Sequence, residues 1–409
     1  MRFVHALLIS LLALPLAVWA QTVTPSATPS ALTEAEAVRL ALARADWLEL
    51  ERGIVQAAEA DVQAADQRPN PTLSYSHERM GGATDSVAQS WLLSQDFDLA
   101  GRRALRREAA QRRVQAVTSE NEQHRLELAD EVRRTYVDVL FSQSVIRATE
   151  SWVTQFRQVE GLVEKQVRAG EASGFDRRRL ARERQGAAAK LAEERANLSL
   201  LQARLSAWVG NDAHLVGNLM PQPLPPLNVA LAQLDQRPEL RALTQHAEAA
   251  DMEGRAARTG GIPDLTVGIG PKWSKSQGVQ DNGFVFEVSI PLPVFDRQQA
   301  GQRRSLAEAS RLRAEQRQIR ARAVAEITGL HQQAMALRQA AMDYRNGAVA
   351  ASPDLIKVAE SAYRGGESSL IELLDAYRSA LETEIAALEL EKRAREARIN
   401  YDLMTGSLQ

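Results

Sequence analysis

The 409-residue sequence contains no cysteine, and only 5% of its residues are aromatic. The lack of cysteine excludes thiol catalysis, thiolate metal sites and a disulfide framework. A net charge of −2 gives no sign of the basic domain that nucleic-acid-binding proteins usually carry. Few aromatic residues beside abundant Ala, Arg, Glu, Leu and Gln are typical of long helices and coiled coils.

The residue patterns of catalytic and metal sites are also missing. The six histidines share no regular spacing, and the sequence has no His-Glu-x-x-His motif and no His-x-His pair. It also has no Ser/His/Asp arrangement and no glycine-rich phosphate loop. We therefore expect a protein that is not an enzyme, needs no cofactor, has no specific metal site and binds no nucleic acid.

The longest apolar run lies at the start of the chain. Residues 1–20 combine a short polar start, an apolar stretch and small residues before Gln21, as in a cleaved secretory signal peptide. The run is shorter than the ~20 residues that a membrane-spanning helix needs, so an uncleaved anchor is the less favoured alternative. Residues 21–31 are rich in Pro, Ser and Thr and predict a flexible linker.

The rest of the sequence contains one pattern twice. Gly170 and Gly366, 196 residues apart, each interrupt a long helical stretch, in RAGEASGF and RGGESSLI. A Pro-x-Leu strand start precedes each stretch, at Pro71 and at Pro263. A period near 200 residues is too long for a solenoid and instead predicts two tandem structural repeats. The predicted repeats are 32–210 and 229–409, joined by a linker at 211–228.

Hydrophobic periodicity predicts the same order in both repeats: a helix, two strands, a long helix, a tight turn and a helix. The predicted helices span 32–68, 100–168, 176–208, 229–259, 298–363 and 368–404, and the strands about 71–78, 90–98, 263–271 and 283–293. Pro353 should kink the fifth helix or mark a junction in it. In each repeat the two shorter helices together match the long one, which predicts a mainly α protein with antiparallel arms of about 100 Å.

The four strands indicate a membrane protein. The second strand of each repeat alternates apolar with other residues, as transmembrane β-barrels do. Barrels need about eight strands, and in lipid every backbone group must be paired. Three copies would supply twelve strands, whereas two would leave a narrow pore, so we favour a homotrimer. The alternative is a coiled-coil structural protein of the periplasm or cell surface, whose hairpins would expose an apolar face to water.

Several motifs stand out along the chain: Asn70-Pro71-x-Leu73, DFDLAGRR at 96–103, SIPLPVFDRQQAG at 289–301, and the turns at 168–176 and 364–372. Together they resemble the motifs of the TolC family of outer-membrane efflux channels. The resemblance covers the chain from about residue 32. It implies a homotrimer with a 12-strand barrel in the outer membrane and a helical tunnel in the periplasm. It also implies docking on a periplasmic adaptor protein and an inner-membrane pump.

Two segments narrow the resemblance: IPDLTVGIG at 262–270 and IPLPVFDRQQAG at 290–301. Within the family they are most similar to the outer-membrane components of cobalt–zinc–cadmium efflux systems, which work with RND pumps. The resemblance thus implies export of heavy-metal cations, with multidrug efflux or type I protein secretion as the alternative. Many relatives carry a cysteine for lipid attachment after the signal. This chain has none, so we expect it to be unlipidated and held in the membrane by its barrel alone.

The two glycine turns are the first candidate site. Gly170 and Gly366 can take the positive φ that ends a helix, which any helical hairpin requires. The resemblance adds that six such turns in a trimer form the mouth that meets the adaptor. The candidate docking residues are Gly170, Glu171, Gly365, Gly366 and Glu367.

Acidic residues just after the turns are the second candidate site. Glu372 and Asp375 lie three residues apart and so share a helix face. The resemblance implies that they line the periplasmic end of the tunnel, where three copies would form rings that favour cations. The alternative is a pair of solvated acids that suit the helix dipole. Their counterparts in the first repeat are Asp176 and Arg179, so the rings would differ between repeats.

Tyr363 is the third candidate, as part of the gate. It matches a family position that helps to hold the tunnel mouth closed through hydrogen bonds and ion pairs. The family's arginine partner, two residues after the turn glycine, is Ser368 here. The resemblance therefore implies a gate at Tyr363 whose closing network differs from that of the family.

Overall fold

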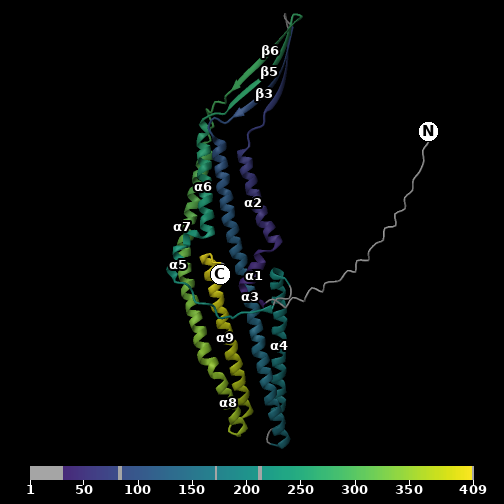
Figure 1. Cartoon of the computed structure of the whole chain (residues 1–409), viewed down its shortest axis with the longest axis vertical. Helices are drawn as coiled ribbons and strands as arrows, with labels where there is room; N and C mark the ends of the chain where they lie inside the picture. The colour runs from purple at the N-terminus through teal and green to yellow at the C-terminus, as the bar shows by residue number, and fades with distance from the viewer. Residues whose placement is uncertain (1–30, 82–84, 171–172, 211–213, 408–409) are drawn as a thin grey trace, which may run out of the picture.

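The computed structural model describes residues 31–81, 85–170, 173–210 and 214–407. Within them the chain is mainly helical, with a four-stranded sheet at one end of an elongated body and two helical hairpins at the other (Figure 1). The predicted signal peptide and most of the predicted linker at 21–31 lie outside the described residues. None of the described helices has the length and apolar composition needed to cross a membrane.

The described residues of the first half form four helices and two long strands. They are α1 (Glu34–Leu42), α2 (Ala45–Asp66), β2 (Thr72–Met80), β3 (Ser86–Phe97), α3 (Arg102–Ala169) and α4 (Gly174–Val209). The α3 helix is unbroken over 68 residues and contains no proline. The prediction of one helix at 32–68 is wrong, because Arg44 is extended between α1 and α2. Its guanidinium binds Asp46 and the carbonyl of Ala207.

The second half has the same order of elements with more interruptions. It contains α5 (Leu227–Ala232), the 3₁₀ turn η1 (Leu234–Gln236), α6 (Pro238–Arg258), the 3₁₀ turn η2 (Thr259–Gly261), β5 (Leu265–Ser276), β6 (Val279–Ser289), α7 (Gln299–Tyr344), the π turn η3 (Arg345–Val349), α8 (Ala350–Arg364) and α9 (Leu370–Thr405). The single helix predicted at 229–259 is wrong, because Pro238 starts a new helix. The helix predicted at 298–363 is divided by η3.

The sheet has the order β2-β3-β5-β6, and all neighbouring strands are antiparallel. The outer strands β2 and β6 leave two edges of the sheet unpaired within the described chain. At Gly270 β5 passes close to β3, since a Cβ atom there would lie 1.8 Å from the carbonyl oxygen of Trp91. A larger residue at this position would push the two hairpins apart.

The two faces of the sheet differ in polarity. One cross-strand row is apolar, and its side chains are 51 to 67% exposed: Leu73, Leu93, Ile269 and Phe286. The neighbouring row points to the opposite face and consists of Thr72, Ser94, Gly268 and Glu287. Tyr75 and Trp91 extend the apolar face, with ring centroids 4.9 Å apart.

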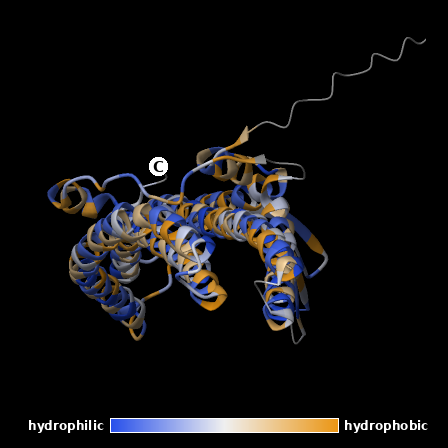
Figure 2. Ribbon diagram, turned by 90° about the horizontal axis from the view of Figure 1, so that it is seen from below, coloured by the Kyte–Doolittle hydropathy of each residue, from blue (hydrophilic) through white to orange (hydrophobic). Residues whose placement is uncertain are grey.

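The helices form a single curved layer, seen end on in Figure 2. Near the sheet the packing order is α2-α3-α6-α7, and near the turns it is α4-α3-α9-α8 (Figure 1). The α3 helix therefore belongs to both parts of the layer. In the part near the turns, α4 and α8 are the two outer helices of the chain.

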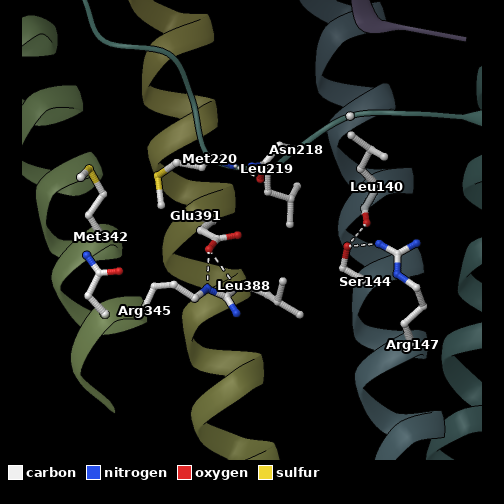
Figure 3. Close-up of a pocket in the computed structure, with 12 residues that line it drawn as sticks. Leu140, Ser144, Arg147, Asn218, Leu219, Met220, Met342, Arg345, Leu388 and Glu391 are labelled. Carbon is white, nitrogen blue, oxygen red and sulfur yellow. Dashed lines mark hydrogen bonds and ion pairs between the residues drawn. The ribbon is translucent and has the colours of Figure 1, made fainter. Parts of the chain in front are cut away.

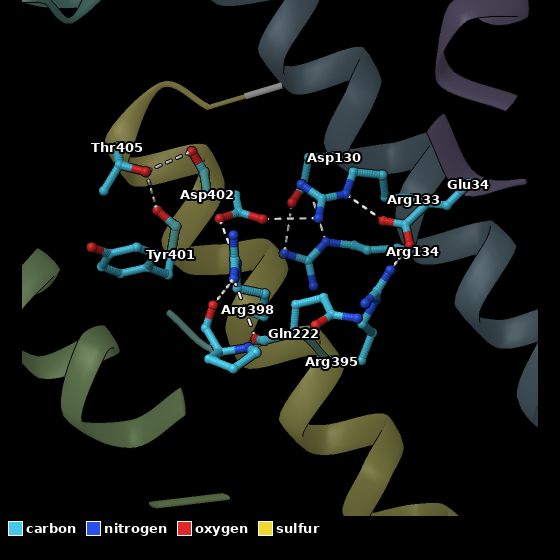
Figure 4. A network of polar contacts seen from close by, with 11 residues as sticks. Glu34, Asp130, Arg133, Arg134, Gln222, Arg395, Arg398, Tyr401, Asp402 and Thr405 are labelled. Atoms are coloured by element: carbon cyan, nitrogen blue, oxygen red, sulfur yellow. Dashed lines mark hydrogen bonds and ion pairs between the residues drawn. The ribbon is translucent and has the colours of Figure 1, made fainter. Parts of the chain in front are cut away.

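A buried polar network joins these parts at mid-height (Figure 4). Arg133 on α3 binds Glu34 on α1 at 2.5 Å and Asp402 on α9 at 2.9 Å. Arg395 also binds Glu34, and Arg398 binds Asp402 at 2.7 Å. The network therefore holds the first helix, the longest helix and the last helix of the chain together.

Nearby, β1 (Ala31–Leu32) pairs in parallel with β4 (His214–Leu215), which lies between α4 and α5. The hydroxyl of Tyr136 lies 2.8 Å from the carbonyl oxygen of Leu32 and 2.7 Å from that of Val216. Burial raises the pKa of this hydroxyl to about 12, so it stays protonated, and its single hydrogen can be shared between the two carbonyl oxygens. One side chain of α3 thus holds both connecting segments.

Candidate functional site at the turn ends of the helical hairpins

The α3–α4 and α8–α9 hairpins end at the same level, opposite the sheet (Figure 1). Gly170 ends α3 with φ 81°, and Gly366 follows α8 with φ 74°. The Gly366 amide donates to the carbonyl of Tyr363 and the Glu367 amide to that of Ala362, as in a Schellman cap. A side chain at either glycine would be strained by the positive φ.

Each turn is followed by a capping box at a matched position. Ser173 accepts from the amide of Asp176 at 3.2 Å, and the Asp176 carboxylate accepts from the amide of Ser173 at 3.1 Å. Ser369 accepts from the amide of Glu372 at 3.3 Å, and Glu372 accepts from the amide of Ser369 at 2.8 Å. Two of the predicted ring acids therefore stabilise helix starts.

A buried apolar cluster lies just inside the turns and holds the two hairpins together. It contains residues of all four helices: Phe156, Val159, Val163, Leu180, Tyr363, Leu370, Leu373, Leu374 and Tyr377. Because both hairpins contribute to this cluster, they cannot separate without exposing apolar surface to water.

Three polar contacts also join the two hairpins within one copy, across the boundary between them that we call the seam. The Tyr363 hydroxyl on α8 donates to Oε1 of Gln166 on α3 at 2.7 Å. Nε1 of Trp152 donates to the carbonyl oxygen of Tyr377 at 3.1 Å, and Arg378 binds Glu183 at 2.9 Å. Burial, with a contribution from the negative charge of Asp176, raises the pKa of Tyr363, so its hydroxyl remains a donor.

The predicted site residues therefore lie at one end of the molecule in different surroundings. Gly170, Gly365, Gly366 and Glu367 are exposed at the turns, and Glu171 lies outside the described residues. Glu372 and Asp375 are exposed, Asp176 is half-buried and Tyr363 is buried. The hydroxyl of Ser368 is buried and has no hydrogen-bond partner among the described residues.

Sequence reasoning missed the partners of these residues. Gln166, Trp152 and Glu183 carry no motif, and only the folded layer brings them to α8 and α9. Tyr377 could have been found, because it follows Leu370, Leu373 and Leu374 on one helix face.

A second feature lies farther from the turns, where η3 interrupts the helix between α7 and α8. The amide of Ala350 donates to the carbonyl of Arg345, five residues back, as in a π turn. In a continuous α-helix the ring of Pro353 would clash with the carbonyl of Val349, four residues earlier. The predicted junction at Pro353 is therefore present as a π turn just before it.

Arg345, the first residue of this turn, links it to α9. Its guanidinium binds Glu384 at 2.6 Å and the buried Glu391 at 2.8 Å. Burial alone would lower the pKa of Arg345, but the hydrogen bonds to the two carboxylates raise it. Two carboxylates from successive parts of α9 therefore neutralise the charge of Arg345.

The π turn borders a pocket of about 500 Å³ between α3, α9 and the segment 217–220 (Figure 3). Arg147 and Ser144 of α3 line one side, and Met342 and Arg345 line the other. The pocket leaves space beside η3. Among the described residues, no group of three or more His, Asp or Glu side chains is placed to hold a metal ion.

Comparisons with known proteins identify this architecture. Residues 37–211 and 231–407 match the family described as "Outer membrane efflux protein". The cobalt-zinc-cadmium resistance protein CzcC of Cupriavidus metallidurans is 25% identical over 359 residues, which cover 86% of this chain and 84% of that protein. The nickel and cobalt resistance protein CnrC of the same organism is 27% identical over 300 residues, 70% of this chain and 69% of that protein.

A solved structure shows the same fold. The outer membrane protein VceC from Vibrio cholerae has a TM-score of 0.73 with 17% identity, and the likeness covers 91% of this chain and 96% of VceC. Since the family match spans most of both halves, the chain belongs to the outer membrane efflux protein family.

Proposed function

We propose that the chain is the exit channel of a tripartite efflux system, a homotrimer that exports heavy-metal cations across the outer membrane. The observation that carries the proposal is the apolar cross-strand row Leu73, Leu93, Ile269 and Phe286, which is exposed on one face of the sheet. Such a face suits contact with lipid, and the polar row behind it suits a water-filled channel. The family consists of efflux proteins, not enzymes.

The open edges of the sheet support a trimer. In lipid an unpaired strand edge is costly, so β2 and β6 need partners from other copies. Three copies would close a barrel of twelve strands. The curved helical layer would then close into a tunnel below the barrel. In this arrangement 32–210 and 229–409 act as two structural repeats in each chain.

The turn ends suit docking on a periplasmic adaptor, which in turn binds an inner-membrane RND pump. Gly170, Gly365, Gly366 and Glu367 are exposed there, and Glu171 belongs to the same turn. Phe175 and Ile371 lie at matched positions beside the turns, 68% and 50% exposed. These two side chains would contact the adaptor.

The cargo assignment rests on the relatives. Proteins of the same family with similarity along most of this chain are named for resistance to cobalt, zinc and cadmium or to nickel and cobalt. Glu372 and Asp375, with Asp176 of the first repeat, would form acidic rings at the periplasmic end, and Tyr363 would be part of the gate. Rings of carboxylates favour the passage of cations.

Residues 1–20 would direct export, with Gln21 as the mature start. Since the sequence has no cysteine, no lipid can be attached through a thioether to the mature start. The barrel would then be the only membrane anchor.

A metal-sensitivity assay tests the function. A strain lacking the gene should regain growth on cobalt, zinc or cadmium when it expresses the wild-type chain. Gly366→Val should reach the outer membrane yet fail to restore growth, because it strains a turn with positive φ. The matched control is Gly329→Val on α7, where nothing lies within 4 Å of a new Cβ atom. Full rescue by Gly366→Val would contradict the docking role of the turn.

A further inference from the structure

The two hairpins repeat along the curved layer by a shift, not by a reflection. Along the layer the order is α4-α3-α9-α8. In both hairpins the helix that follows the turn (α4 or α9) therefore comes before the helix that precedes the turn (α3 or α8). Matched residues of the two hairpins, 196 positions apart, therefore face the same side of the layer. In a closed ring of copies, α8 would meet α4 of the next copy in the same way that α3 meets α9 within one copy.

This relation explains two exposed apolar side chains on α8. Leu355 and Val358 are 65% and 68% exposed and point away from the apolar cluster at the turns. Their counterparts on α3 are Val159, which is 4% exposed, and Leu162, which packs against the cluster. The first hairpin has this surface covered by α9 of the same chain, whereas the second has nothing of the described chain over it.

The covering residues also differ between the two halves. On α9 the buried pair Leu373 and Leu374 belongs to the cluster that contains Val159. The matched pair on α4 is Arg177 and Arg178, both exposed. Neither arginine forms a hydrogen bond or ion pair with another described residue. An apolar pair within the copy thus corresponds to a charged pair at its outer edge.

We propose that Leu355 and Val358 of one copy dock under Arg177 and Arg178 of the next copy, and that this charged seam between copies is the one that separates when the tunnel end opens. The proposal rests on the trimeric channel proposed above. The arginine stems can cover apolar surface while the guanidinium groups remain in water. The seam within a copy, built from Leu373 and Leu374, is held more strongly and separates only after the charged seam has opened.

Few carboxylates on α8 are available to neutralise these arginines. Asp354 pairs with Lys357 of its own helix at 3.4 Å, and Glu360 pairs with Arg364 at 3.1 Å and also binds Tyr377. The seam between copies therefore combines a small apolar contact with positive charges that repel one another. Such a contact is weaker than the apolar seam within a copy, and salt should strengthen it by screening the repulsion.

Disulfide cross-linking tests the contact. The chain has no native cysteine, so the double variant Arg178→Cys/Val358→Cys introduces the only two thiols. The α4 and α8 helices are opposite edges of one copy, so a disulfide between them must join two copies. We expect oxidation of the detergent-purified trimer to give covalent dimers and trimers. Quantitative maleimide labelling of Cys-substituted position 358 without any cross-link would overturn the proposal.

Conductance tests the opening role. Arg177→Leu/Arg178→Leu copies the apolar pair of α9, and we expect its single-channel conductance in planar bilayers to fall several-fold. The dependence of the open fraction on salt should also be lost. The control is Lys190→Leu/Arg204→Leu, which removes the same charge from α4 far from the turn. Unchanged conductance in an intact trimer would overturn the proposal. A wild-type chain that forms no trimer or no channel would instead refute the proposed function.

Discussion

The hydroxyl of Tyr363 on α8 donates a hydrogen bond of 2.7 Å to Oε1 of Gln166 on α3. These two residues belong to different hairpins, and their bond lies directly inside the two turns. The seam within one copy therefore has a hydrogen bond next to its apolar cluster, and we call this bond the clasp.

Loss of this clasp should loosen the turn end. Tyr363→Phe keeps the ring in the cluster but removes the donor, which costs about 1 kcal/mol of seam stability. We expect a higher open probability in planar bilayers. Tyr344→Phe is the control, because that hydroxyl has no hydrogen bond to another described residue. Equal open probability in the two variants would show that the clasp does not restrain opening.

Two variants can separate the helix-capping role of Glu372 from its proposed role in an acidic ring. Glu372→Gln retains a side chain that can accept from the Ser369 amide, as capping boxes with Gln do, but removes the charge. We expect Glu372→Gln/Asp375→Asn to keep the thermal stability of the wild type and to lose most of its block by trivalent cations. Glu372→Ala should instead lower the stability, because the amide of Ser369 loses its acceptor at the start of the helix. Block that persists in the amide variant would leave Glu372 as a helix-capping residue and Asp375 as an exposed acid, with no ring role for either.

Arg345 should be more important for stability than other surface arginines. Its removal leaves the buried carboxylate of Glu391 without a cation, and such changes cost about 3 kcal/mol or more. We expect Arg345→Ala to lower the melting temperature of the protein clearly. Arg39→Ala, which breaks an exposed pair with Glu36, should change it little. Similar melting temperatures for the two variants would show that the ion pair between Arg345 and Glu391 does not stabilise the fold.

Glu51 should make stability depend on pH in the acid range. Its hydrogen bonds with Arg125, at 2.5 and 2.6 Å, lower the pKa of Glu51 below its ordinary value of 4.5. A group with a lowered pKa in the folded state stabilises the fold above the unfolded pKa, and this contribution is lost as the pH falls through the folded pKa.

The measurement for Glu51 is the melting temperature between pH 7 and pH 3. Glu51→Gln should be less stable than the wild type at pH 7, and the difference should shrink below pH 4.5. A difference that stays constant over this range would mean that the ion pair with Arg125 does not contribute.

The sequence predicts the helix–strand order because long helices and alternating strands leave strong periodic signals. It does not predict the break at Arg44, since neither Gly nor Pro occurs there and the extended conformation depends on Asp46 and on the distant Ala207. The break before Pro238 did have a local signal, because proline is common at the first position of a helix.

In the candidate site too, some features follow from the local sequence and others depend on how distant segments pack. The positive φ of Gly170 and Gly366 follows from residue type, and the Ser-x-x-acid spacing shows that Asp176 and Glu372 can cap helices. The contact of Tyr363 with Gln166 depends on how two hairpins pack, and no local pattern encodes it. Whether the acids form rings depends on further copies of the chain, and that stays a prediction.

The unbroken α3 helix and the divided α7–η3–α8 path have a mechanical consequence. Both paths run from the sheet to the turns, but only the second contains a joint, with a pocket beside it. Bending of the α8–α9 hairpin can be absorbed at η3, whereas α3 transmits any displacement along its whole length. We expect the tip of the α8–α9 hairpin to bend without moving the sheet, whereas a displacement of the α3–α4 tip would reach the sheet through α3.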